Sequence, residues 1–139
     1  MKIEKIDHVA ILVQDMRAAE KFFADLFETK FAKLGETKEL DIRSIMDPTG
    51  IEIAEPLLPD GVTARTLKNR GEGLTLLSLK VSNLDEAMAE MKSRGIRQVG
   101  QIKHGGMRAT LYHPKDTFGV MIELIGYETE HPAIIAANR

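Results

Sequence analysis

The sequence predicts an α+β fold in which two βαβββ modules pair into a curved, half-open sheet around a cavity. Two observations favour this fold. A strand pattern followed by a helix pattern occurs near residue 8 and again near residue 76, an offset of 68 residues. Three short strand patterns then follow each helix pattern. Because one βαβββ unit has a sheet face that it cannot cover alone, two such units are expected to pair.

The first module is predicted from alternation, capping and spacing. In "IDHVAILV", residues 6–13, the period of two places His8 on one face with Ala10 and Leu12. Asp15 then predicts the start of a helix, whose apolar residues recur at helical spacing: Met16, Ala19, Phe23 and Leu26. Short strands are expected at about residues 30–35, 40–46 and 50–56, the last after a turn at 47–50.

The second module repeats these signals. "LTLLSLKV", residues 74–81, predicts a strand, and Asn83 is the expected N-cap of the helix that follows. Gly95 fits the end of that helix, and its apolar stripe is Leu84, Ala87, Met88 and Met91. Three strands are expected at about residues 97–103, 107–113 and 119–126, the last after the turn "HPKDTFG".

One domain over residues 1–139 accounts for these elements. Module 1 covers about residues 4–57, a linker with room for a short helix covers about 58–72, and module 2 covers about 73–127. The tail 128–139 either is disordered or covers a partner subunit with Ile134 and Ile135. A ferredoxin-like sandwich is the alternative fold, but its units carry fewer strands.

Composition excludes several classes of function. The net charge is −2 and no basic run occurs, so neither a nucleic acid nor an anionic membrane is an expected partner. Without cysteine, the chain has no disulfide, no catalytic thiolate and no sulfur-ligated zinc. The sequence has no signal-peptide pattern and no apolar run of about 20 residues, so a cytoplasmic location is expected.

The sequence resembles the vicinal oxygen chelate superfamily, which includes glyoxalase I, extradiol dioxygenases, bleomycin-resistance proteins and methylmalonyl-CoA epimerases. Three stretches carry the resemblance: "DHVAILV" in the first strand, "EPLLPDG…LKNRGEG" between the modules and "LYHPKDTFGVMIEL" near the end. The similarity extends over residues 5–126, and the closest pattern is that of the methylmalonyl-CoA epimerases. The resemblance implies the glyoxalase-like version of the paired-module fold.

The resemblance also implies a divalent metal held by four side chains on the first and last strands of each module. Three of these positions match donors in this chain, namely His8, Glu52 and Glu123. The fourth family position, a histidine, matches Leu76, which has no lone pair to offer. A further family acid matches either Glu36 or Glu39, and the pattern does not separate the two.

With a metal, one imidazole and two carboxylates would form a three-ligand set that suits Co, Mn, Ni or Zn. This set differs from the two-histidine, one-carboxylate triad of iron oxygenases, so a dioxygenase is disfavoured. Without a metal, Glu52 and Glu123 in one closed cavity would repel, and one pKa would rise. The two glutamates are therefore the candidate catalytic residues in either case, and no organic cofactor is expected.

Two functions remain open. The first is an isomerase or related lyase, similar to methylmalonyl-CoA epimerase, that performs acid–base chemistry beside a carbonyl, with an acyl-CoA as a possible substrate. The second is a metal-free binding protein, similar to the bleomycin-resistance branch, that holds a small molecule in an apolar pocket. The other histidines, His104, His113 and His131, are expected to be structural or exposed. A homodimer is expected, because such modules expose sheet edges that pairing would cover.

Overall fold

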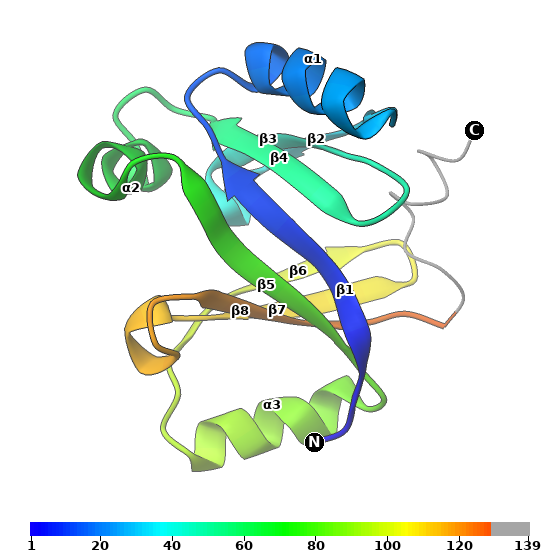
Figure 1. Cartoon of the computed structure of the whole chain (residues 1–139). Coiled ribbons are helices and arrows are strands. Elements are labelled where there is room, and N and C mark those ends of the chain that lie inside the picture. Colours follow the sequence, from blue (N-terminus) through cyan, green and yellow to red (C-terminus); the bar gives the residue numbers. More distant parts are fainter. Residues whose placement is uncertain (129–139) are drawn as a thin grey trace. The chain divides into compact units, whose positions relative to one another are not determined.

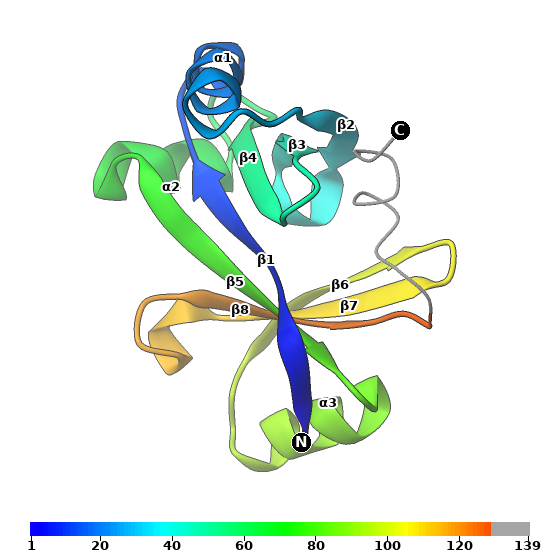
Figure 2. The same ribbon diagram turned by 45° about the vertical axis from the view of Figure 1, so that its right-hand side comes forward.

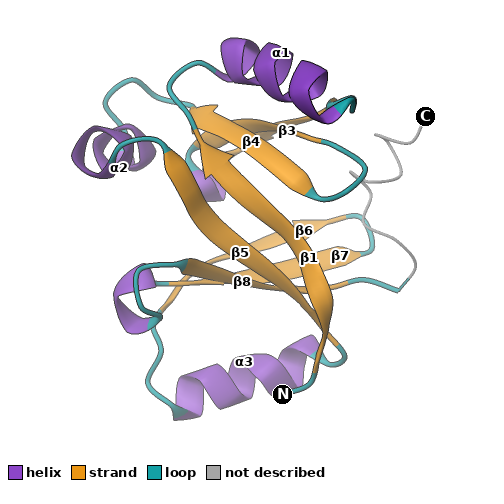
Figure 3. Ribbon diagram, viewed as in Figure 1, coloured by secondary structure: helices purple, strands orange, loops and turns teal. Residues whose placement is uncertain are grey.

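The computed structural model describes residues 1–128, and its elements follow the repeated βαβββ order expected from the sequence (Figures 1 and 3). The first module contains β1 (Ile3–Leu12), α1 (Met16–Phe27), β2 (Ala32–Thr37), β3 (Ile42–Met46) and β4 (Ile51–Pro56). The linker forms α2 (Val62–Arg70). The second module contains β5 (Gly73–Val81), α3 (Leu84–Ser93), β6 (Gln98–His104), β7 (Met107–Tyr112) and β8 (Met121–Gly126). The α+β class is thereby confirmed.

The described chain divides into two compact units. Unit 1 contains residues 1–9 and 75–128, and unit 2 contains residues 10–74. In unit 1 the strand order is β1-β5-β8-β7-β6, and in unit 2 it is β2-β3-β4-β1, so β1 contributes to both units. Among residues 1–128, no helix has the length and apolar character needed to cross a membrane.

Helix α1 packs against β4 in unit 2 (Figure 1). It covers one apolar cluster of that unit. The Asp15 side chain accepts a hydrogen bond from the Ala18 backbone at 3.1 Å, which confirms the predicted N-cap. The cluster under the helix contains Val13, Ile45 and Ile53, with Met16, Ala19 and Phe23 from the helix side. Leu26 was expected in the same stripe, but it is 58% exposed because the helix buries a narrower face than the spacing suggested.

The β3–β4 turn of unit 2 is built around Asp47, which is 1% exposed. Its carboxylate accepts hydrogen bonds from the backbone of Thr49 and Ile51, at 3.1 and 2.8 Å. It also accepts one from the Thr29 hydroxyl at 3.0 Å. The predicted turn is therefore held by a side chain that imitates the backbone of a tight turn.

The N-terminus of helix α2, in the linker, is capped by a carboxylate from a distant segment of unit 2. Gly61, its N-cap, supplies no side chain, and Asp41 instead accepts a hydrogen bond from the Thr63 backbone at 3.4 Å. A Cβ placed on Gly61 would lie 2.0 Å from Asp41 Oδ2. A side chain at position 61 would therefore require the Asp41 carboxylate to move from its place at the start of α2.

Helix α3 packs on β7 and β8 in unit 1, as the turned view also shows (Figure 2). The predicted N-cap Asn83 accepts a hydrogen bond from the Glu86 backbone at 3.0 Å, and Gly95 follows the helix with a φ of 73°. All four predicted stripe residues lie in or against one cluster, which is completed by Val81, Tyr112 and Leu124 of the strands: Leu84, Ala87, Met88 and Met91. Helix α3 therefore covers one face of the sheet in unit 1, and the side chains on the opposite face do not contact this helix.

Hydrogen bonds connect the turn that precedes β8 to the residue directly before β6. Asp116 accepts three hydrogen bonds from Arg97, from its backbone, Nε and Nη2 at 3.0, 2.9 and 3.0 Å. These bonds lower the pKa of Asp116 from 3.8 to about 2. His113 accepts a hydrogen bond from the Lys115 backbone at 3.1 Å, so this histidine has the structural role expected for it.

Candidate functional site

Glu123 lies in β8 with 4% of its surface exposed. It is paired in register with Ser78 on β5 and with Leu111 on β7. Because paired residues on neighbouring strands project from the same face, Glu123 shares its face with Ser78 and Leu111. The next residue, Leu124, contributes to the cluster under α3. Glu123 is therefore on the face turned away from α3.

Within unit 1, Ser78 and His8 both contact the Glu123 carboxylate, and both meet the same oxygen. The Ser78 hydroxyl donates a hydrogen bond to Oε1 at 2.6 Å. His8 Nε2 lies 3.3 Å from Oε1. Ser78 is 0% exposed and His8 is buried as well, so both contacts are shielded from water. The sequence prediction that His8 and Glu123 belong to one site is consistent with this contact.

His8 is oriented by its neighbour in sequence. Its Nδ1 lies 2.6 Å from Asp7 Oδ2, and Asp7 Oδ1 accepts a hydrogen bond from the Tyr127 hydroxyl. An ionised Asp7 requires the Nδ1–H form of the ring, which leaves Nε2 directed to Glu123. A carboxylate that holds the remote nitrogen is typical of histidines that ligate metals or transfer protons.

Burial raises the pKa of Glu123 above its ordinary value, because the ionised carboxylate loses hydration. His8 and the hydrogen bond from Ser78 oppose this effect, and the nearby Asp7 carboxylate adds to it. A carboxyl group with a raised pKa is better suited to exchange protons near neutral pH than an exposed one. The environment of Glu123 thus favours acid–base chemistry.

Leu76 lies on β5 opposite Met121 and is 6% exposed. It precedes Ser78 by two residues, so both side chains project from one face of the strand. Leu74, near the start of the strand, is 67% exposed. The position that the family pattern gives to a histidine is therefore apolar and buried.

Glu52 belongs to unit 2, where it lies buried in β4. Its Oε2 accepts a hydrogen bond from the hydroxyl of Ser44, a buried residue of β3, at 2.9 Å. This unit therefore also contains a buried glutamate held by a buried serine. Glu36 and Glu39, the two alternatives for a further acid, are both exposed to solvent.

The donors in unit 1 fit a divalent metal ion in part. Two ligands at about 2.0–2.2 Å from one tetrahedral ion lie about 3.3–3.6 Å apart, and His8 Nε2 and Glu123 Oε1 are separated by 3.3 Å. Within either unit taken by itself, the described residues contain no group of three His, Asp or Glu side chains suited to a metal. His8 and Glu123 are thus a fitting pair of ligands that needs further donors.

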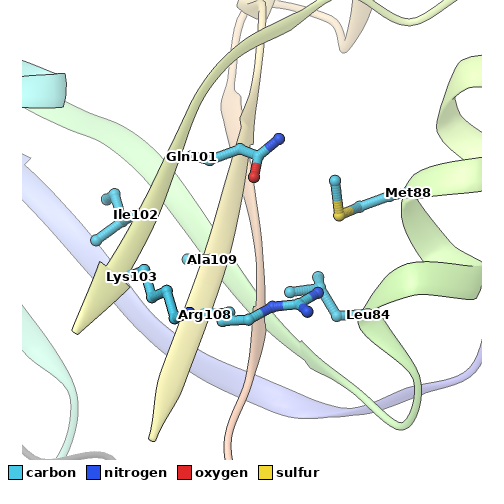
Figure 4. A pocket seen from close by; sticks show the side chains of 7 residues that line it. All are labelled: Leu84, Met88, Gln101, Ile102, Lys103, Arg108 and Ala109. Atoms are coloured by element: carbon cyan, nitrogen blue, oxygen red, sulfur yellow. The ribbon is translucent and has the colours of Figure 1, made fainter. Parts of the chain in front are cut away.

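Two hollows lie away from these residues. One of about 100 Å³ in unit 1 is formed by α3 and the β6–β7 hairpin, and Figure 4 shows its lining side chains, among them Met88, Gln101 and Arg108. The other, of about 500 Å³ in unit 2, lies beside the start of α1 and includes Phe31 and Ile45. Neither hollow is lined by a predicted site residue.

Sequence reasoning missed three residues of the site in unit 1: Asp7, Ser78 and Tyr127. Asp7 could have been found, because an acid directly before a candidate ligand histidine is a signal for an orienting carboxylate. Ser78 could have been found only with the register of β5 against β8. Tyr127 lies beyond the last strand, and its contact with Asp7 depends entirely on the folded chain.

Comparisons with known proteins agree with this fold. A family model described as the Glyoxalase/Bleomycin resistance protein/Dioxygenase superfamily matches residues 5–124. The mitochondrial methylmalonyl-CoA epimerase of Mus musculus is 27% identical over 130 residues, which are 88% of this chain and 73% of the mouse protein. The human enzyme is 28% identical over 127 residues, 86% of this chain and 72% of its own length.

Solved structures of methylmalonyl-CoA epimerases are also similar to this chain. A methylmalonyl-CoA epimerase in complex with methylmalonyl-CoA and NH4+ has a TM-score of 0.80 and 25% identity, covering 94% of this chain and 100% of that one. A Streptomyces coelicolor epimerase variant with bound 2-nitronate-propionyl-CoA has the same TM-score, identity and coverage. The epimerase of Mycobacterium tuberculosis has a TM-score of 0.79 and 28% identity, covering 91% and 90% of the two chains.

Proposed function

Because the chain belongs to the glyoxalase/bleomycin resistance protein/dioxygenase superfamily, we propose that it is an isomerase that moves a proton beside the carbonyl of an acyl-CoA thioester. The observation that carries this proposal is Glu123, a buried carboxylate with a raised pKa in contact with His8. The similarity to methylmalonyl-CoA epimerases supports the choice of substrate class.

Glu123 would act as the base that takes the proton from the carbon next to the thioester carbonyl. The electrons of the C–H bond pass into the enolate, and return of a proton to the other side of that carbon completes the inversion. Glu52 is the second carboxylate that the family pattern assigns to the site, and it is our candidate for the return step. The 2.6 Å contact with Asp7 would keep His8 in one tautomer throughout.

We also propose a divalent metal ion of the Co, Mn, Ni or Zn type. His8 and Glu123 would hold it, together with Glu52 according to the family pattern, and water or substrate would complete the set because Leu76 has no donor. The ion would supply positive charge next to the developing enolate oxygen. Without a metal, the reaction would lack this charge, and Glu52 and Glu123 would act as carboxyl groups that coordinate no ion.

Deuterium exchange tests the proposed reaction. Methylmalonyl-CoA incubated with the protein in D2O should gain deuterium at its α-carbon, measured by mass spectrometry. Glu123→Gln should slow the exchange by about 10²–10⁴-fold, the usual contribution of a general acid or base. Glu86→Gln, an exposed carboxylate at the start of α3, is the matched control and should exchange as fast as wild type. No exchange by wild type, with and without added cobalt, would contradict an epimerase function.

A second candidate function is binding of an apolar small molecule without reaction. It is favoured by Leu76, which lies buried on the same face as Glu123 in unit 1 and opposite Met121. Calorimetry distinguishes the two functions: tight binding of an acyl-CoA analogue with no deuterium exchange would support a binding protein.

The assembly and the location of the protein are part of this proposal. We propose a homodimer, since β2 in unit 2 and β6 in unit 1 are edge strands whose backbone groups a partner could cover. A cytoplasmic location stays a prediction from the sequence, whereas the curated mammalian relatives are described as mitochondrial.

A further inference from the structure

The hydroxyl of Ser78 contacts the Glu123 carboxylate in unit 1. It donates to Glu123 Oε1 at 2.6 Å, and the register of β5 against β8 pairs the two residues directly. On β7 the residue paired directly to Glu123 is the apolar Leu111. Ser78 and His8 both contact the carboxylate and so restrict where it points.

A glutamate side chain has three rotatable bonds, and fixing a side chain of this kind costs up to about 2 kcal/mol of conformational entropy. His8 meets the carboxylate at 3.3 Å, a longer contact than the hydrogen bond from Ser78. Ser78 itself is fixed, because it is completely buried in the strand next to Glu123. A short bond from a rigid strand is well suited to select one orientation of the carboxylate.

We propose that Ser78 is a positioning residue that holds Glu123 with Oε1 toward His8. This role deepens the proposed function, because it concerns the carboxylate that would exchange the proton. It also follows from the local sequence: two residues before Ser78 the strand carries Leu76, so on this face of β5 the hydroxyl of Ser78 is the donor within reach of Glu123.

Unit 2 contains a second contact between a buried serine and a buried glutamate. Ser44 is buried on β3 and donates to Glu52 Oε2 at 2.9 Å. Each of the two carboxylates in the predicted site is thus held by a buried serine of an adjacent strand. Ser44 is paired with Ala54 and reaches Glu52 diagonally, whereas Ser78 is paired with Glu123 directly, and the two serines lie on strands that do not correspond in the two modules.

Three substitutions at position 78 separate the effect of the hydrogen-bond donor from the effect of side-chain shape. Ser78→Ala removes the donor, Ser78→Cys keeps the shape with a weak donor, and Ser78→Thr keeps the hydroxyl. The matched control is Thr110→Val, since Thr110 is also completely buried but its hydroxyl contacts Gln98, at 2.7 Å, and not Glu123. Melting temperatures establish that each variant is folded before the other measurements.

The expected result is a loss of about 10–100-fold in kcat of deuterium exchange and in cobalt affinity for Ser78→Ala and Ser78→Cys. KM should change little, because the proposed role of Ser78 is to contact Glu123 and not the substrate. Ser78→Thr should recover most of both quantities, and Thr110→Val should match wild type. If the alanine and cysteine variants keep the kcat and the cobalt Kd of wild type within twofold, Ser78 does not position Glu123.

Crystal structures of wild type and Ser78→Ala test the inference without any activity. In the variant, the Glu123 carboxylate should leave its place beside His8 Nε2. An unchanged carboxylate would overturn the inference even if wild type is an active enzyme. A wild type that exchanges no deuterium while the carboxylate moves in the variant would overturn the proposed function and leave the positioning role supported.

Discussion

Leu76 is the residue at which this chain departs most clearly from the family pattern. Leu76 is buried on β5, two residues before the serine that contacts Glu123. A leucine there removes a nitrogen donor and adds apolar surface to the face of the site. This single position therefore bears on both candidate functions, since it weakens a metal site and favours a pocket for an apolar group.

Leu76→His should restore a donor at this position. Cobalt or zinc should bind more tightly than to wild type, and the affinity should fall at acidic pH because the imidazole must be neutral to bind. Without metal, the variant should be less stable by about 1–3 kcal/mol, the cost of a buried polar group without a partner. Metal should recover this loss by binding only to the folded state. Thermal melts at increasing cobalt concentration measure both effects.

Leu79→His is the matched control for this experiment. Leu79 lies on the same strand but packs against the cluster under α3, on the opposite face. It should lose stability without any gain in cobalt affinity. If Leu76→His also binds cobalt no better than wild type, either the register drawn between the two halves is wrong or the cavity suits a ligand that needs no ion.

The start of α2 is an element that depends on one close contact. Gly61→Ala would place a Cβ 2.0 Å from Asp41 Oδ2, so the carboxylate must move away from the Thr63 backbone that it caps. We expect a loss of about 0.5–2 kcal/mol, as for the loss of other helix caps. Denaturant unfolding measures it.

Two comparisons make the cause of this loss explicit. Gly106→Ala, at a glycine where a Cβ meets nothing within 4 Å, should change stability by less than about 0.5 kcal/mol. The double variant Gly61→Ala, Asp41→Ala should be more stable than the sum of the single effects predicts. Additive effects would mean that the contact does not determine the choice of glycine.

The contribution of the turn before β8 to the stability of the fold depends on pH. Since the pKa of Asp116 is lowered from 3.8 to about 2 by its bonds to Arg97, its ionised form is favoured by folding. This contribution is complete above the ordinary pKa and is lost as the pH falls toward about 2. Asp116→Asn should therefore lower the melting temperature near neutral pH, with a difference that shrinks between about pH 4 and pH 2.

Arg97→Gln should produce the same pattern, because it removes the other partner of the pair. The combination of both substitutions should be little worse than either one. A difference between wild type and Asp116→Asn that stays constant as the pH falls from about 4 to about 2 would show that the pair does not act through the charge of Asp116.

At the scale of the whole molecule, the proposed homodimer is tested by light scattering. A mass of about twice the 15.5 kDa of the chain is expected across a concentration series, because edge strands left open would favour association. A monomer mass at all concentrations would refute the dimer. The tail with Ile134 and Ile135, expected from the sequence to be either disordered or a cover for a partner, lies outside the described residues.

Much of the fold could be predicted from local signals. The order of strands and helices, the caps at Asp15 and Asn83 and the helix end at Gly95 each depend on a few adjacent residues, and all of them were found in the structure. The apolar stripe of α3 was also predicted in full. In α1 the prediction failed at Leu26, because spacing indicates which residues share a face but not how wide the covered part of that face is.

The candidate site depended on more than local signals. The sequence by itself determined the types of chemical group, an imidazole at His8 and carboxylates at Glu52 and Glu123, since the repeat and the family pattern identify them. Only the tertiary structure decided which atoms meet in unit 1, where Ser78 and His8 share one oxygen of Glu123. The reason is physical: strand register, burial and side-chain orientation arise from contacts between segments far apart in the chain, and these contacts determine the pKa of Glu123.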